Sequence, residues 1–272
     1  MNLLSWMMLA FLLSAGTSVD TVDVNKLTDT VKRIREKYKI GGQFCLAANI
    51  PLNGQDVDLP SRESVMNKLN ANQVYKDSTV VIAKVVKPEH AELRVLRNLS
   101  TLIDKSRDNF LLIYSYLSPC GTTCINQDSK HNILTNITGT VLKHWSDVAF
   151  VFEVVFDKPK NQRNRGSRPE IIPKEELIKT LTDLGATGIG LQNIFRCYKA
   201  NSEFQCHSCS YQGKVSNVCV DNNAEPGQEE GRDIDIRRDR YRSRSRDRGV
   251  KRDRSRSRDR KKQRQKWKQR KT

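Results

Sequence analysis

The stretch NFLLIYSYLSPCGTTC, residues 109–124, decides the fold. Its first nine residues form an apolar and aromatic run with the length and composition of a buried β-strand. Ser118 is a good helix N-cap and Pro119 a good first helical residue, so a helix is expected to begin here. Cys120 and Cys124 would lie on one face of that helix, whose positive end favours thiolates. The stretch therefore predicts a strand that ends at two metal-ligating sulfurs.

A second motif, HAELRVL at residues 90–96, lies in a helix expected over 89–104. An ordinary amphipathic helix explains its apolar residues, so His-x-Glu alone indicates little. Together with the two cysteines, however, His90 completes three protein ligands of a tetrahedral zinc ion and leaves the fourth position open for water. Glu92 is a carboxylate that the zinc ion does not need as a ligand, and it is the candidate for proton transfer. These residues are the inventory of a zinc deaminase.

The order His-x-Glu, then Pro-Cys-x3-Cys, resembles the cytidine deaminase superfamily, and HAELR followed by SPC is similar to its AID/APOBEC-like branch. With a signal peptide added, the chain is similar to the secreted AID/APOBEC-like deaminases of fish and other vertebrates. The resemblance covers about residues 24–197. It implies hydrolytic deamination of a cytosine-type base with Zn²⁺ held by His90, Cys120 and Cys124, Glu92 as the catalytic residue, and a role in immune defence.

Two positions bear on the substrate. Polynucleotide deaminases of this branch usually carry an aromatic residue two positions before the proline, where this chain has Leu117. Tyr116 and Ser118 flank that position and are substrate-binding candidates, although Tyr116 is equally explained by packing of the strand. Asn49 is a third candidate, for the rim of the pocket, although Asn49-Ile50-Pro51 also fits a turn that ends a strand.

The remaining pattern predicts an α/β fold of three layers, with a mixed five-stranded sheet and helices on both of its faces. Strands are expected at 43–50, 79–86, 109–117, 147–156 and 188–198, and helices at 23–38, 61–69, 89–104 and 173–185. A helix between the last two strands makes them parallel, because a hairpin needs no helix. That arrangement matches the polynucleotide-editing branch of the superfamily better than the free-nucleoside branch.

The N-terminus, MNLLSWMMLAFLLSAGTSVD, carries an apolar run at 3–13 followed by small residues. The run is too short for a membrane span, so it predicts a signal peptide over 1–18 and secretion of a protein without a transmembrane span. A buried N-terminal helix is the alternative. Sequons at Asn98 and Asn136 are compatible with the secretory route.

Seven cysteines suit a secreted chain of this size. Cys197, Cys206, Cys209 and Cys219 could form two disulfides, or a second zinc site around Cys206-His207-Ser208-Cys209. An oxidising compartment favours the disulfides. Cys45 is either a buried thiol or a partner for one of these four.

The charge is concentrated at the C-terminus. Residues 232–272 hold 21 Lys and Arg against 6 Asp and Glu, which gives +15 of the net +17 of the chain. Such a segment cannot bury enough apolar surface to fold, so a disordered tail is expected over 221–272. It is either a solubility tail or an anchor for polyanions such as nucleic acid or heparan sulfate.

The sequence thus predicts a signal peptide at 1–18, a zinc-dependent deaminase domain at 19–200, a Cys-rich extension at 201–220 and the tail. The substrate is a cytosine-type base in single-stranded nucleic acid or in nucleotides. One alternative is a non-catalytic secreted protein that binds polyanions on a deaminase scaffold, and another reads RSRSRDR as a nuclear Arg-Ser region. Glu92 favours the enzyme, because a structural zinc ion does not need it.

Overall fold

The structure is a computed structural model that describes residues 22–158 and 171–226. The predicted signal peptide at 1–18 and the tail beyond residue 226 lie outside the described residues. The chain divides into two units, Met1–Ala224 and Glu225–Thr272, and the first contains all the secondary structure treated below.

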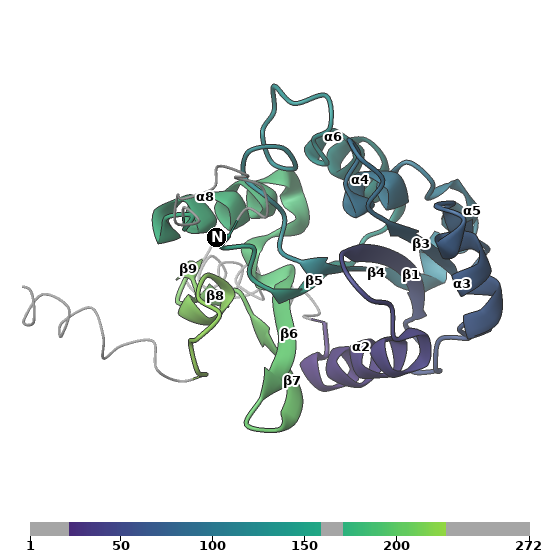
Figure 1. Cartoon of the computed structure of the whole chain (residues 1–272). Helices are drawn as coiled ribbons and strands as arrows, with labels where there is room; N and C mark the ends of the chain where they lie inside the picture. Colours follow the sequence, from purple (N-terminus) through teal and green to yellow (C-terminus); the bar gives the residue numbers. More distant parts are fainter. Residues whose placement is uncertain (1–21, 159–170, 227–272) are drawn as a thin grey trace, which may run out of the picture. The chain divides into compact units, whose positions relative to one another are not determined.

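The centre of this unit is a mixed sheet with the strand order β2-β3-β1-β4-β5-β6-β7 (Figure 1). The strands are β1 (Phe44–Pro51), β2 (Tyr75–Lys76), β3 (Val80–Lys84), β4 (Asn109–Leu117), β5 (Val148–Val154), β6 (Ile194–Ala200) and β7 (Glu203–Ser208). β4, β5 and β6 are parallel neighbours, whereas β1 is antiparallel to β3 and β4. The predicted parallel pairing of the last two of the five expected strands is confirmed.

The predicted number of five strands was wrong, because the sheet has seven. β2 is only two residues long and has no pattern of its own. β7, with the sequence EFQCHS, is too polar to be recognised as a strand, and it forms by antiparallel pairing with β6. The sheet therefore continues beyond residue 200, into the segment that the cysteine spacing set apart as an extension.

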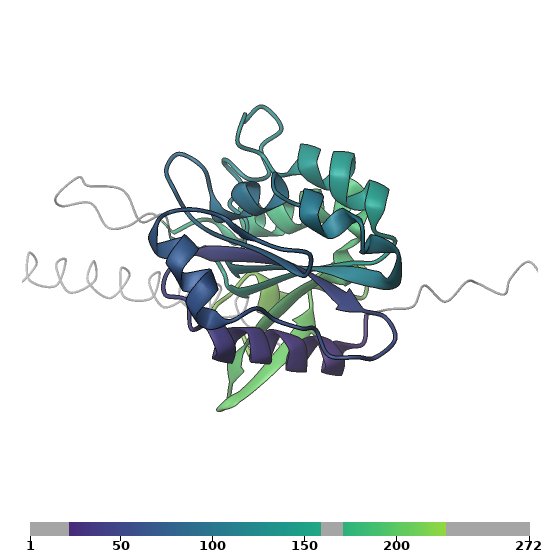
Figure 2. The ribbon, with the colours of Figure 1, turned by 90° about the vertical axis from the view of Figure 1, so that its right-hand side faces the viewer.

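Helices cover both faces of the sheet (Figure 2). One face carries α2 (Val24–Tyr38) and α3 (Arg62–Asn70), and the other carries α4 (Ala91–Leu96), α5 (Ser100–Ile103), α6 (Leu134–Asn136), α7 (Leu142–His144) and α8 (Lys174–Leu184). α2 follows its sequence pattern, with Asp23 as a capping residue and a buried stripe made of Leu27, Val31, Ile34 and Tyr38. The predicted three-layer arrangement is confirmed.

Two predicted helices differ from the structure. The helix expected over 89–104 is divided into α4 and α5, and the side chain of Asn98 donates a hydrogen bond to the carbonyl of Arg94 at 2.8 Å, next to the break. No helix begins at Ser118 either. A single turn forms between Cys120 and Cys124, in which the backbone N–H of Cys124 donates to the carbonyl of Cys120 at 3.1 Å. The next helix along the chain is α6. The Gly-Thr-Thr between the cysteines has low helix propensity.

The late cysteines form two disulfides, Cys197–Cys206 and Cys209–Cys219, as the favoured interpretation predicted. The alternative zinc site around Cys206 and Cys209 was wrong, because both sulfurs are used in these bonds. Cys197–Cys206 joins β6 to β7. Cys209–Cys219 closes a loop that contains the short hairpin of β8 (Ser210–Tyr211) and β9 (Lys214–Val215). Cys45 is a buried thiol in β1.

A buried arginine holds the segment after this hairpin on the sheet. Arg196, in β6, is only 3% exposed, and it donates to the carbonyls of Val218 and Asp221 and to the side chain of Asn222. The side-chain amide of Asn222 in turn pairs with both the N–H and the carbonyl of Val155, at 2.9 Å each. The guanidinium thereby satisfies carbonyls that would otherwise be buried without a partner.

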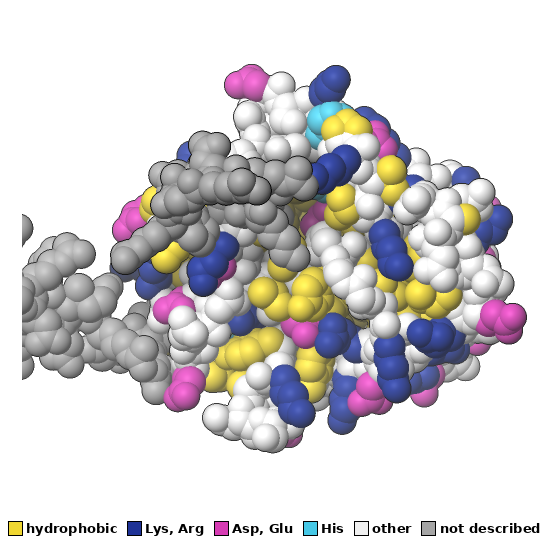
Figure 3. Space-filling model, viewed as in Figure 1, with side chains coloured by type: hydrophobic (Ala, Val, Ile, Leu, Met, Phe, Trp, Pro, Cys, Tyr) yellow, Lys and Arg dark blue, Asp and Glu magenta, His cyan; other side chains and the backbone are white. Residues whose placement is uncertain are grey.

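On the face seen in Figure 3, Lys and Arg side chains are interspersed with Asp and Glu. This dispersion agrees with the nearly balanced charge of the chain before residue 232. Within 22–158 and 171–226, no helix is long and apolar enough to cross a membrane.

Candidate metal centre and catalytic cavity

The predicted ligands meet at the carboxyl end of β4, where parallel sheets commonly bind ligands. β4 ends at Leu117 and leads into the turn that holds Cys120 and Cys124. His90 is the N-cap residue of α4, which packs against β1 and β3, and its ring reaches the two sulfurs. Residues from two motifs, thirty positions apart in the sequence, are thus brought to one point.

Three ligand atoms form a compact group that could hold a metal ion. The Nδ1 atom of His90 lies 3.1 Å from the Sγ atom of Cys124 and 3.7 Å from that of Cys120, and the two sulfurs are 3.3 Å apart. Tetrahedral zinc, with bonds of about 2.0–2.3 Å, separates its nitrogen and sulfur ligands by about 3.5–3.8 Å. The observed distances are within about 0.5 Å of that geometry, so the residues present fit a zinc ion.

A glycine allows the turn between the two sulfurs to lie against α8. A Cβ atom at Gly121 would be 2.7 Å from the Oγ1 atom of Thr180, a distance that real Cβ atoms do not show. Any larger residue would require either the Thr180 side chain or the turn to move. Packing against α8 therefore favours glycine as the first residue between the two cysteines.

Neighbouring groups favour a thiolate at this turn. The hydrogen bond between the two thiol groups is the largest cause that lowers the pKa of Cys120 well below its usual value, and His90 adds to the effect. The same bond is the largest cause that raises the pKa of Cys124. The helix N-terminus that the sequence analysis invoked for this effect is absent at Ser118, so the two side chains replace it as the cause.

Glu92 lies beside this group and is only 2% exposed. Its Oε1 atom accepts hydrogen bonds from Gln43 Nε2 at 2.8 Å and from Ser115 Oγ at 2.7 Å. Its Oε2 atom is buried and has no hydrogen-bond partner among the described residues. Burial is the largest cause that raises the pKa of the carboxyl group, which is a common property of groups that transfer protons.

These groups line a cavity of about 580 Å³. Five of the predicted site residues are in its wall: His90, Glu92, Ser118, Cys120 and Cys124. Ser118 also joins the ends of two strands, since its N–H donates to Val154 and its hydroxyl accepts from the N–H of Phe156. Leu117, which the sequence pattern had indicated as a position that bears on the substrate, also lines the cavity. No sequence motif indicated the other lining residues, which are Gln43, Val85, Thr122, Thr123, Phe156, Ile171, Ile172, Pro173 and Glu176.

The structure does not bring Asn49 or Tyr116 to this cavity. Asn49 lies inside β1, 4% exposed, and its amide donates to the carbonyl of Leu102 and accepts from the indole of Trp145. Tyr116 packs on the opposite face of the sheet, against the α2 side, where the guanidinium of Arg35 lies 5.9 Å from its ring centre. Alternation along β4 explains this placement, because Ser115 and Tyr116 point to opposite faces.

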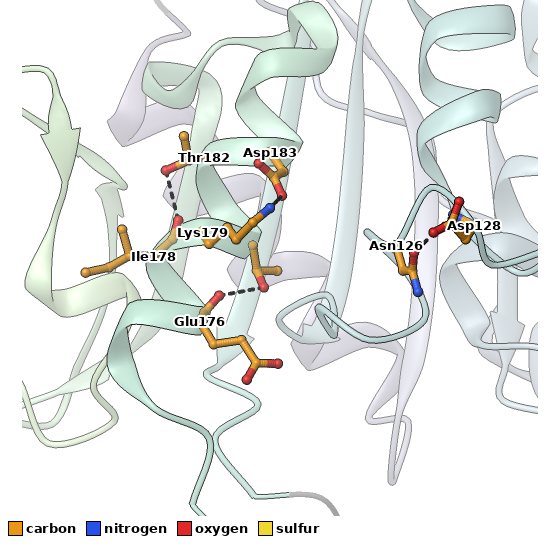
Figure 4. A network of polar contacts seen from close by, with 8 residues as sticks. Asn126, Asp128, Glu176, Ile178, Lys179, Thr182 and Asp183 are labelled. Atoms are coloured by element: carbon orange, nitrogen blue, oxygen red, sulfur yellow. Dashed lines mark hydrogen bonds and ion pairs between the residues drawn. The ribbon is translucent and has the colours of Figure 1, made fainter.

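A second, polar groove of about 930 Å³ adjoins the cavity. Thr122 and Glu176 line both. The other lining residues of the groove are mostly hydroxyl and amide side chains: Asn126, Gln127, Asn132, Thr135, Thr138, Thr180 and Thr187. Figure 4 shows Glu176 on α8 facing the side of the groove formed by the turn at Asn126 and Asp128, with the Lys179–Asp183 ion pair one turn farther along the helix.

Comparison with known proteins gave one family. A family model described as Secreted Novel AID/APOBEC-like Deaminase 1 matches residues 25–223. The matched region includes all seven strands of the sheet, the three candidate ligands and both disulfides. Searches of curated proteins and of solved structures returned no match.

Proposed function

The chain belongs to the Secreted Novel AID/APOBEC-like Deaminase 1 family, and from this premise we propose that it is a secreted, zinc-dependent enzyme that hydrolytically deaminates a cytosine-type base. The substrate is single-stranded nucleic acid or a nucleotide. His90, Cys120 and Cys124 hold the zinc ion, and Glu92 is the catalytic residue.

The observation that carries this proposal is the Oε2 atom of Glu92. This oxygen is buried beside three clustered ligand atoms, and no described residue satisfies it. A buried carboxylate oxygen without a partner costs free energy, and a scaffold would gain nothing from keeping it. A group that must accept and release a proton needs such a free atom. The arrangement therefore supports an enzyme over a non-catalytic scaffold.

A zinc ion at the three ligands would supply Lewis-acid activation of a water molecule. Glu92 Oε2 would accept the two protons of the attacking water in turn, and pass one to the ring nitrogen and the other to the departing amine. In the balanced reaction a C–O bond forms, the C–N bond to the exocyclic amine breaks, and water plus the aminated base give ammonia and the carbonyl base. Glu92 ends the cycle in its starting protonation state.

The walls of the cavity support a planar base as the reacting group. Leu117, Phe156 and Ile172 offer apolar contact, and Thr122 offers a hydrogen bond. Phe156 provides an aromatic ring that the chain lacks at position 117. The adjoining polar groove leaves room for the sugar and further parts of a substrate larger than a free base.

Secretion through cleavage of a signal peptide at 1–18 completes the proposal. The two disulfides fit an extracellular protein, as does the family description. The basic residues at 221–272 all lie outside the described part of the chain, and we propose that they bind polyanions, including the nucleic acid substrate.

The test is incubation of the purified, zinc-loaded full chain with single-stranded DNA and RNA oligonucleotides, cytidine and its nucleotides. Mass spectrometry should detect the exchange of an amine for a carbonyl in at least one of them. Glu92→Gln is the matched control, because it keeps the size of the side chain. A zinc-loaded, folded protein that changes no member of the panel would favour the non-catalytic alternative.

A further inference from the structure

The Oε1 atom of Glu92 is held by two side chains that no sequence motif identified. Ser115 Oγ donates to it at 2.7 Å and Gln43 Nε2 at 2.8 Å. Ser115 comes from β4, Gln43 directly precedes β1, and Glu92 is in α4. The carboxylate is therefore held between three elements that are distant in the sequence.

The two donors also hold each other. Gln43 Nε2 donates its second hydrogen to Ser115 Oγ at 2.9 Å, and Gln43 Oε1 accepts from the backbone N–H of Leu117 at 2.9 Å. The pairing of β1 with β4, in which Cys45 is opposite Ser115, sets the register that brings them together. Each amide hydrogen, the hydroxyl hydrogen and the amide oxygen thus has a partner within the group.

Packing of the strand does not explain a serine at position 115. Its side chain is completely buried, and its neighbours on the same face of β4 are Ile113 and Leu117. A β-branched apolar residue would fill such a site without the cost of burying a hydroxyl. The carboxylate of Glu92 explains the hydroxyl, because Oε1 accepts its hydrogen.

We propose that Gln43 and Ser115 are positioning residues, which occupy Oε1 of Glu92 and thereby assign proton transfer to Oε2. A carboxylate has two equivalent oxygens, and its rotation would present either of them or neither to the substrate. Two donors on one oxygen fix the rotation and leave the second oxygen directed at the reacting atoms. This inference rests on the proposed function, since it concerns the same reaction.

The first test compares Ser115→Ala and Gln43→Leu with the unchanged full chain. Each variant should lower kcat by about 10- to 100-fold, as loss of an orienting partner commonly does. KM should stay within about twofold, because binding of the substrate does not depend on the orientation of the carboxylate. Zinc content should be unchanged. Ser106→Ala is the matched control, since it removes another buried serine hydroxyl, away from the cavity, and should keep full kcat.

The second test needs no turnover. Ser115→Ala should lower the midpoint of thermal unfolding in the unchanged chain, because it leaves Oε1 with one donor fewer, and should lower it by less in Glu92→Leu, where only the contact with Gln43 is lost. If Ser115→Ala does not fold, Gln43→Leu takes its place, since Gln43 is half-buried and directly precedes the first residue of β1.

The outcomes separate the two proposals. If the wild-type chain is active and both variants fold and keep full kcat, the positioning role is overturned. The absence of thermal coupling between Ser115 and Glu92 overturns it as well. A wild-type chain without activity but with intact coupling overturns the proposed function, while the hold on Oε1 stands.

Discussion

The sulfur atoms of Cys120 and Cys124 lie 3.3 Å apart and are not bonded, whereas four of the other five cysteines are paired in disulfides. A chain that oxidises its late cysteines while it leaves this close pair reduced needs a reason for the difference. A metal ion supplies one, because coordinated thiolates are protected from oxidation by the bonds that they make to it.

Zinc retention should depend on each of the three ligands. His90→Ala, Cys120→Ser and Cys124→Ser should each abolish binding of about one zinc ion per chain, because a three-ligand site cannot lose one. Elemental analysis of the purified variants measures this. Cys45→Ser is the matched control, since Cys45 is also a buried free thiol but lies outside the group, and it should retain the metal.

Glu92→Gln should retain zinc and lose activity. Removal of a proton-transfer group costs about 10²- to 10⁴-fold in rate. Steady-state kinetics on the substrate found by the panel would measure the loss. Glu176→Gln, a change of the same kind in the wall of the same cavity, should keep kcat near that of the unchanged chain. Equal activity in Glu92→Gln and the unchanged chain would exclude the proposed role of the carboxylate.

Asn49→Leu should affect stability and leave the reaction alone. Its amide bonds the indole N–H of Trp145 and the carbonyl of Leu102 in the core. Each buried partner left unsatisfied costs about 1–3 kcal/mol of the free energy of unfolding, which denaturant titration can measure. KM of the folded variant should equal that of the unchanged chain. A selective rise in KM would instead place Asn49 in substrate binding.

Loss of the Cys209–Cys219 disulfide should lower the free energy of unfolding by about 2–4 kcal/mol. The double variant Cys209→Ser/Cys219→Ser tests this by denaturant titration under non-reducing conditions. The unchanged chain, titrated with a reductant present, should lose more stability than the variant does without one, because reduction also opens Cys197–Cys206. Identical curves for the oxidised and reduced chain would contradict a stabilising role of both disulfides.

Removal of residues 229–272 should weaken binding of single-stranded oligonucleotides and reduce its dependence on salt, because the segment carries most of the excess positive charge. Apparent KM should rise, while kcat for a short substrate at saturation stays nearly unchanged. Fluorescence anisotropy at several salt concentrations measures the first effect. Binding and salt dependence unchanged by the truncation would leave the segment only a role in solubility.

Most of the fold could be read from the sequence because its signals are local. α2 has a capping aspartate and a regular apolar stripe, and β4 is an apolar run of nine residues. The proximity of the three candidate ligands could be predicted as well, since His90 and the Cys-x3-Cys pair carry a chemical pattern. β7 could not, because its formation depends on the neighbouring β6 and a disulfide, which are tertiary contacts.

The hydrogen-bond partners of Glu92 could not be predicted from the sequence either. A single serine in an apolar strand and a single glutamine before another strand form no pattern, and only the register of β1 against β4 brings them together. The position of Tyr116 away from the cavity has a related cause. Tyr116 is close to the motif in the sequence, but the alternation of side chains along β4 places it on the opposite face of the sheet.

Asn222 connects the wall of the cavity to the segment that follows the second disulfide. Its side-chain amide is hydrogen-bonded to Val155, next to the cavity residue Phe156. Arg196 donates hydrogen bonds to Asn222 and to the carbonyls of Val218 and Asp221. The segment that carries Asn222 leaves the loop closed by Cys209–Cys219. Reduction of that disulfide would remove the covalent closure of the loop, and this part of the cavity wall would then be held only by the hydrogen bonds of Arg196 and Asn222.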